Sequence, residues 1–112
     1  MNWNTLTSPE QIEEIKKLSE QKPVLIFKHS TRCSISSMSL DRLLRKWQDS
    51  DGDKLEPFYL DLIAYRDISD LVAREFGVFH QSPQAIIIKN GEAIYDSSHF
   101  NISYQDILSQ SS

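Results

Sequence analysis

The chain has 112 residues, 12 of them basic and 16 acidic, and we expect one domain over residues 1–112 with a formal net charge of −4. This charge argues against a broad nucleic-acid surface, because phosphate binding needs concentrated lysine and arginine. The single cysteine rules out a disulfide within the chain and is typical of the reducing cytoplasm. We expect no export signal, because residues 1–5 offer neither a basic nor an apolar region. We expect no membrane span, since no apolar run approaches the ~18 residues that a span needs.

The first half of the chain predicts two helices around one strand. Ser8 is expected to be the N-cap of a helix, with Pro9 at its first position and Gln11 completing a capping box. The apolar stripe of this helix reaches to about residue 20 and contains Ile12, Ile15 and Leu18. The apolar run Val24–Lys28 predicts a strand buried on both faces. A second helix, from about residue 33 to 48, is indicated by the helical spacing of Leu40, Leu43, Leu44 and Trp47.

The second half predicts another strand, a helix, a hairpin and a final helix. A polar turn at 49–54, expected to be solvated, leads into a strand at Leu55–Asp61, and the next helix ends at Gly77. Asn90-Gly91 is a strong two-residue hairpin signal that would pair residues 84–89 with 92–95. The last helix is expected to start near Ser103. This order predicts an α/β fold in which a four-stranded mixed sheet has helices on both faces.

The lone Cys33 lies in a polar segment where the first strand gives way to a helix. Unpaired backbone N–H groups and the positive end of the helix dipole favour an anion there. Arg32, directly before the cysteine, also favours the thiolate. A buried and inert core cysteine is the alternative, but Arg32 and Ser34 flank this one in place of apolar residues. We therefore predict that Cys33 is a nucleophile.

Two blocks of sequence resemble a known family. They are Phe27-Lys28-His29-Ser30-Thr31-x-Cys33-x-Ile35-Ser36 and Phe76-Gly77-Val78-x-His80-x-Ser82-Pro83-Gln84. Together they resemble the small bacterial monothiol bacilliredoxins, the thioredoxin-like proteins of the bacillithiol system, from about residue 8 to residue 108. The resemblance implies a thioredoxin-like domain in which Pro83 is cis and its loop faces Cys33. The family usually has proline after the cysteine and glutamate before the Ser-Pro, whereas this chain has Ser34 and Gln81.

The resemblance also implies a reaction. Dithiol thioredoxins carry a second cysteine three residues after the first, but this chain has Ser36 there, so another thiol must release any mixed disulfide on Cys33. The implied activity is a monothiol exchange in which Cys33 removes bacillithiol from protein mixed disulfides. The implied partners are bacillithiolated client proteins and bacillithiol itself, as a co-substrate. We expect no other cofactor, no metal, and a monomer or weak dimer.

Polar residues around Cys33 are expected to support the exchange, although each has a structural alternative. Thr31 and Ser34 would hydrogen-bond the sulfur or cap the helix, and Ser36 would donate to the thiolate or only occupy the first turn. Lys28 or Arg32 would contact a carboxylate of bacillithiol, or Lys28 would only cover the sheet edge.

The loop before the hairpin and the three histidines complete the set of candidates. The backbone around Ser82 is expected to pair with an extended substrate, with Pro83 holding the loop open. His29 would tune the thiolate or be packed and hydrogen-bonded, and His80 would orient the Pro83 loop or reach the active face. His99 has no assigned partner and is expected at the surface or in packing.

Two other functions fit part of this pattern. A monothiol glutaredoxin that carries an iron–sulfur cluster would have glycine and phenylalanine where this chain has Ser34 and Ile35. A sensor or stress interaction module in which Cys33 is oxidised without turnover needs the same accessible thiolate.

Overall fold

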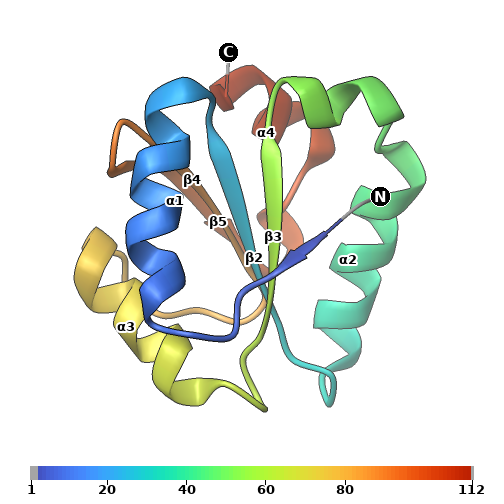
Figure 1. Ribbon diagram of the computed structural model, residues 1–112. Helices are drawn as coiled ribbons and strands as arrows, with labels where there is room; N and C mark the ends of the chain where they lie inside the picture. Colours follow the sequence, from blue (N-terminus) through green and yellow to red (C-terminus); the bar gives the residue numbers. More distant parts are fainter. Residues whose placement is uncertain (1–2, 112) are drawn as a thin grey trace.

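A five-stranded mixed sheet lies at the centre of the computed structural model, which describes residues 3–111 (Figure 1). The sheet order is β1-β3-β2-β4-β5, with β1, β3 and β2 mutually parallel and β4 antiparallel to both β2 and β5. The strands are β1 (Asn4–Thr5), β2 (Val24–His29), β3 (Glu56–Asp61), β4 (Gln84–Lys89) and β5 (Glu92–Ser98). The helices are α1 (Glu10–Gln21), α2 (Ser34–Lys46), α3 (Arg66–Phe76) and α4 (Tyr104–Ser111), with short 3₁₀ helices η1 (Asp49–Asp53) and η2 (His99–Asn101).

The strand β1 corrects the expected four-stranded sheet to five strands. It is only two residues long, and it pairs in parallel with β3 at Phe58 and Tyr59. Two polar residues have no alternating apolar pattern, so nothing local marks Asn4–Thr5 as a strand. The sheet edge that β3 offers decides its conformation, and the Asn4 side chain adds a hydrogen bond to the Pro57 carbonyl at 3.1 Å.

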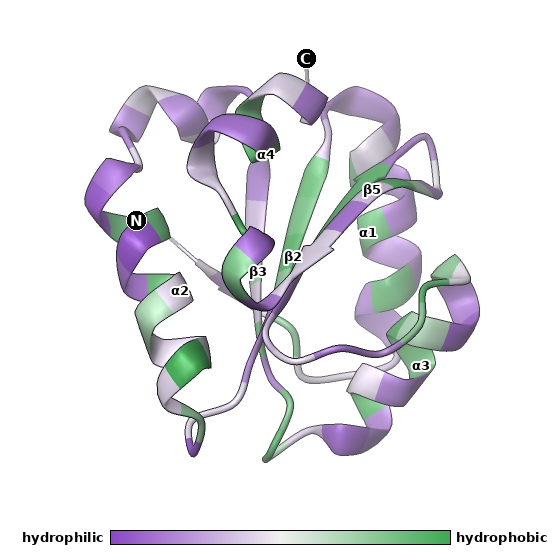
Figure 2. Cartoon of the chain, turned by 180° about the vertical axis from the view of Figure 1, so that it is seen from behind, coloured by the Kyte–Doolittle hydropathy of each residue, from purple (hydrophilic) through white to green (hydrophobic). Residues whose placement is uncertain are grey.

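Helices cover both faces of the sheet, as predicted. The residues of β2 are buried throughout and alternate between two apolar layers. Val24 and Ile26 belong to the layer under α1 and α3, whereas Leu25 and Phe27 belong to the layer under α2 and α4. In Figure 2 the helices carry hydrophilic and hydrophobic residues together, as expected of helices with one face on a sheet. No helix within residues 3–111 is long and apolar enough to cross a membrane.

The start of α1 differs from the expected capping box. The helix begins at Glu10, its N-cap is Pro9, and no side chain caps it. Gln11 supplies only half of the box, since its Oε1 accepts the backbone N–H groups of Thr7 (2.7 Å) and Ser8 (3.0 Å). The apolar stripe also ends early, because Leu18 is exposed and Ser19 is buried in its place.

The polar turn after α2 is largely exposed, as its composition predicts, but it is ordered around one buried residue. The α-helix ends at Lys46, and residues 49–53 form η1 around a buried Asp51. The Asp51 carboxylate accepts the backbone N–H of Gln48 at 2.8 Å and the Tyr104 hydroxyl at 2.6 Å. This bond ties α4 to η1 and raises the pKa of Tyr104 to about 12.

The predicted turns form where glycine and asparagine allow them. Gly77 ends α3 with φ +64°, and Asn90 and Gly91 turn the hairpin with φ +52° and +79°. The strand β5 continues past the expected residue 95 to Ser98, with an irregular register at Ile87 and Ile88. The Ser82–Pro83 peptide bond is cis.

Candidate active site

Cys33 lies at the point where the loop after β2 enters α2. It is the N-cap residue, with extended backbone dihedrals, and the first helical residue is Ser34. This is one position earlier than the expected first turn. Its own N–H donates to the Ser30 carbonyl at 3.2 Å, and its carbonyl accepts Ser37 N–H at 3.1 Å.

The environment of the Cys33 sulfur favours an anion. The N–H groups of the first helical turn have no carbonyl partner within the helix and form the positive end of its dipole. No acidic side chain lies in the first turn of α2. Cys33 is a free cysteine and is partly exposed. Disulfide exchange needs a thiolate as its nucleophile, so Cys33 is the candidate for that role.

Three of the predicted supporting residues flank Cys33 at the surface. Thr31, Arg32 and Ser34 are all exposed. Within residues 3–111 their side chains take part in no hydrogen bond or ion pair, and no side chain caps α2. Within these residues the structure therefore has neither of the roles expected for Thr31 and Ser34, a hydrogen bond to the Cys33 sulfur or a cap on α2, and their hydroxyl groups are unengaged.

Ser36 is engaged by other groups than the cysteine. Its side chain is fully buried, and its Oγ accepts the backbone N–H of Ser30 at 3.0 Å and lies 2.7 Å from His29 Nδ1. Burial lowers the pKa of His29, and the carboxylates of Asp61 and Asp41 only partly oppose this. A neutral His29 with an unprotonated Nδ1 takes the single hydroxyl proton of Ser36. In this state the expected donation from Ser36 to the thiolate is not made.

His29 is the packed and hydrogen-bonded histidine that one of the two interpretations expected. It is 6% exposed, and its ring lies 5.8 Å from the Tyr59 ring. The last strand residues, Lys28 and His29, point to opposite faces of the sheet, so His29 faces α2 and Lys28 faces α3. His99, in contrast, is exposed, as expected for a surface histidine.

The loop before β4 lies at the same end of the sheet as Cys33. Gln84 is the register partner of Lys28, so the antiparallel pairing brings the preceding Pro83 to the end of β2 that leads to Cys33. Pro83 is buried and its carbonyl accepts His99 N–H at 3.1 Å, while Ser82 is partly exposed. The structure thus brings the two blocks of the sequence together, although 50 positions separate Cys33 from Pro83.

Lys28 is not available to a ligand. It is 0% exposed, its Nζ donates to the Ser69 carbonyl at 3.0 Å, and it lies 3.3 Å from His80 Nδ1. Burial lowers its pKa to about 8, and Asp70 opposes that effect. The prediction that Lys28 contacts a bacillithiol carboxylate, or covers the sheet edge, is therefore wrong. A lysine inside an otherwise apolar strand was the signal that it is buried.

His80 joins the Pro83 loop to this buried lysine. Its Nδ1 also lies 3.3 Å from the Ser69 hydroxyl, and burial together with the charge of Lys28 lowers its pKa. In a neutral ring the one lone pair of Nδ1 accepts from Lys28 Nζ or from the Ser69 hydroxyl, and either bond holds the loop against α3. Of the two roles expected for His80, the structure favours orientation of the loop.

Sequence reasoning missed Gln84 as a second anchor of the loop. Its fully buried side chain donates through Nε2 to the Phe79 carbonyl at 3.0 Å and accepts Gln81 N–H at 3.4 Å. These two bonds hold the backbone of the loop at Phe79 and Gln81. In this conformation the Phe79 residue is 91% exposed. A polar glutamine between Pro83 and the apolar run 85–88 was the available signal in the sequence.

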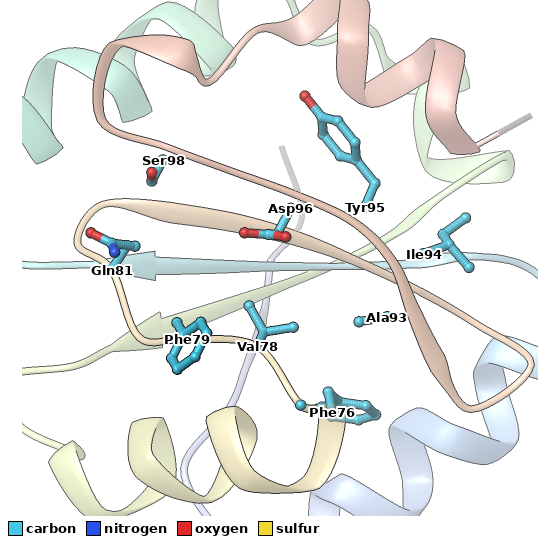
Figure 3. Close-up of a pocket in the computed structure, with 10 residues that line it drawn as sticks. Phe76, Val78, Phe79, Gln81, Ala93, Ile94, Tyr95, Asp96 and Ser98 are labelled. Atoms are coloured by element: carbon cyan, nitrogen blue, oxygen red, sulfur yellow. The ribbon is translucent and has the colours of Figure 1, made fainter.

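A pocket of about 470 Å³ lies beside this loop, between the end of α3 and the edge strand β5 (Figure 3). Phe79 and Gln81 line it from the loop, and Tyr95 and Asp96 from β5. Cys33 is not among its lining residues. Cys33 therefore lies outside this pocket.

Comparisons with known proteins agree with this geometry. A thioredoxin-fold protein assigned as an oxidoreductase is 30% identical, with a TM-score of 0.79, over 96% of this chain and 92% of the other. The thioredoxin of Malassezia sympodialis (19% identity, TM-score 0.73, 96% and 86% coverage) and that of Fasciola hepatica (12%, 0.67, 95% and 93%) share the fold. Residues 4–107 match the family of the monothiol bacilliredoxin BrxC. With its one cysteine at the start of α2 and a serine three residues later, this thioredoxin-like chain belongs to the monothiol bacilliredoxin family.

Proposed function

We propose that this protein is a thiol–disulfide oxidoreductase that removes bacillithiol from protein mixed disulfides through Cys33, in the reducing cytoplasm. The observation that carries the proposal is the partly exposed Cys33 at the N-cap of α2, with a buried serine where dithiol relatives have a resolving thiol. Membership of the monothiol bacilliredoxin family supports bacillithiol as the thiol that is transferred.

The first step is an exchange of one disulfide for another. The Cys33 thiolate attacks the bacillithiol sulfur of a protein–S–S–bacillithiol disulfide. The old S–S bond breaks, the client leaves as a thiolate that takes up a proton, and a Cys33–S–S–bacillithiol bond forms. No net oxidation or reduction occurs, since one disulfide is consumed and one is made.

A second thiol completes the cycle. Ser36 has no sulfur, so release within the chain is not available. The thiolate of a second bacillithiol attacks the bacillithiol sulfur of the adduct, giving bacillithiol disulfide and the Cys33 thiolate. An external reductant must then reduce the disulfide that is released.

Residues around Cys33 have separate proposed roles in this cycle. The N–H groups of the first turn of α2 stabilise the thiolate, and Thr31 and Ser34 offer free hydroxyls to the substrate. Arg32 is the cation that remains for the bacillithiol carboxylates, because Lys28 is buried. The backbone at Ser82 pairs with the extended client segment beside the disulfide.

A transfer assay with a bacillithiolated client protein tests the proposal. We expect intact mass spectrometry to detect one bacillithiol on Cys33, and we expect many turnovers per molecule when free bacillithiol is supplied. Cys33→Ser should abolish transfer. Arg32→Gln should raise the KM for the bacillithiolated client, whereas Arg45→Gln, in the last turn of α2, should leave it unchanged.

Each rival predicts a different result in the same experiment. A sensor would react once per molecule without turnover. A preference for glutathione mixed disulfides would show that the assignment of bacillithiol as the transferred thiol is wrong. A brown colour after anaerobic purification would favour an iron–sulfur carrier. An inert Cys33 would refute the proposal altogether.

A further inference from the structure

The hydroxyl of Ser36 and the ring of His29 form a buried pair at the first turn of α2, the helix that Cys33 caps. We propose that His29 is a positioning residue for Cys33, and that it acts by deciding where the hydroxyl proton of Ser36 points. This inference deepens the proposed function, and its importance for catalysis rests on that function. The inference itself concerns only the reactivity of the Cys33 thiolate.

The hydrogen bonds at Ser36 Oγ can be counted. A serine hydroxyl has one proton and two acceptor lone pairs. One lone pair accepts the backbone N–H of Ser30 at 3.0 Å, and the Oγ lies 2.7 Å from His29 Nδ1. The bond to Ser30 is independent of pH, so the state of His29 alone decides whether Ser36 donates or accepts in the second bond.

Two arrangements follow from this count. When His29 is neutral with its proton on Nε2, Ser36 donates to Nδ1, and its proton is not available to the sulfur. When His29 is protonated, Nδ1–H donates to Ser36 Oγ, both lone pairs are filled, and the hydroxyl proton is free to point elsewhere. Cys33 is the N-cap of α2 and Ser36 is the third helical residue, in the first turn that an N-cap side chain ordinarily faces. The freed proton is thus released on the side where a thiolate needs a donor.

The surroundings of His29 make the neutral state the resting one. Burial lowers its pKa, which the carboxylates of Asp61 at the end of β3 and Asp41 on α2 partly oppose. Tyr59, also on β3, packs against the ring at 5.8 Å. Protonation of His29 therefore requires a lower pH than an ordinary histidine needs. In the proposed switch, it changes the Ser36 hydroxyl from a donor to histidine into a donor to the thiolate.

The same pair also fixes the loop that carries the nucleophile. Ser36 holds the N–H of Ser30, and the carbonyl of Ser30 holds the N–H of Cys33 at 3.2 Å. Both backbone groups of Ser30 are therefore bonded to α2 or its N-cap. The serine at the position of a resolving cysteine consequently has a hydrogen-bonding role in this chain.

His29→Asn is the sharpest test, because asparagine keeps an acceptor near the position of Nδ1 and does not titrate in this range. Cys33 is alkylated with iodoacetamide from pH 4.5 to 9, in the wild-type protein and in the His29→Asn, Ser36→Ala and double variants. We expect His29→Asn to lower the rate about tenfold near pH 5, the size of one charge-assisted hydrogen bond, and to leave it unchanged near pH 8.5. In the Ser36→Ala background this difference should vanish.

The control and the contrary outcomes are well defined. His99→Asn should leave the pH profile unchanged, since His99 is exposed and asparagine tolerates its left-handed backbone. No effect of His29→Asn, or an equal effect with and without the Ser36 hydroxyl, would overturn the proposal, the latter because charge alone would then suffice. If His29→Asn does not fold, ¹⁵N NMR of the wild-type protein decides: a neutral His29 with its proton on Nδ1 would contradict the proposal. Neither measurement uses bacillithiol, so failure here is distinct from failure of the transfer assay.

Discussion

The stability of the protein should rise between pH 8 and pH 10.5 because of one buried lysine. Lys28 is 0% exposed, and its Nζ contacts a carbonyl and a neutral imidazole in place of a carboxylate. Its pKa is therefore lowered from 10.5 to about 8, burial being the main cause and Asp70 opposing it. Between these two values the unfolded chain binds a proton that the folded chain does not, so the free energy of unfolding increases with pH. At 1.36 kcal/mol per pH unit, the full change is about 3 kcal/mol.

Urea unfolding of the wild-type protein and of Lys28→Met at pH 7 and pH 10.5 measures this change. Methionine has a similar unbranched shape and no charge, so the wild-type protein should gain about 3 kcal/mol relative to the variant as the pH rises. The raised pKa values of Tyr59 and Tyr104 act in both proteins and cancel in the comparison. Lys46→Met, which alters an exposed lysine, controls for the loss of a lysine as such. A stability difference that is the same at both pH values would refute the reasoning.

Three further predictions concern the anchors of the fold and of the Pro83 loop. Gln84→Leu leaves the Phe79 carbonyl without its buried donor. We expect the free energy of unfolding in urea to fall by about 1–3 kcal/mol and bacillithiol transfer to slow. Unchanged transfer would show that the loop needs no anchor. Gly77→Ala places a side chain on a left-handed residue at φ +64°. It should lower the free energy of unfolding by about 1–2 kcal/mol, measured by thermal unfolding. An unaltered midpoint would mean that the turn rearranges freely. Tyr104→Phe removes the 2.6 Å bond to the buried Asp51 and should cost about 1.5–3 kcal/mol at pH 7. That difference should shrink as the pH rises toward 12, because the folded pKa of Tyr104 is raised and the bond stabilises the fold only while the phenol keeps its proton; a constant difference would contradict it.

Local patterns predicted the elements well where side-chain chemistry acts over a few residues. The buried strand Val24–His29, the glycine that ends α3 and the Asn90-Gly91 turn were all predicted from the sequence. Where the deciding partner is distant, the predictions failed. The strand β1 exists only because β3 offers an edge, and η1 is ordered because Tyr104, 53 positions away, bonds to Asp51.

The sequence by itself identified the family, which the comparisons confirm, and Cys33 as the candidate nucleophile. A lone cysteine between an apolar strand and an amphipathic helix has only one place in such a fold, and the serine three residues later removes the resolving thiol. Tertiary structure alone decided what the polar neighbours do. Lys28 and His29 are adjacent in the chain, but the strand turns them to opposite faces, one toward His80 and the other toward Ser36. Sequence spacing does not report which groups are removed from water, and burial is what fixes the protonation states and hydrogen bonds behind Cys33.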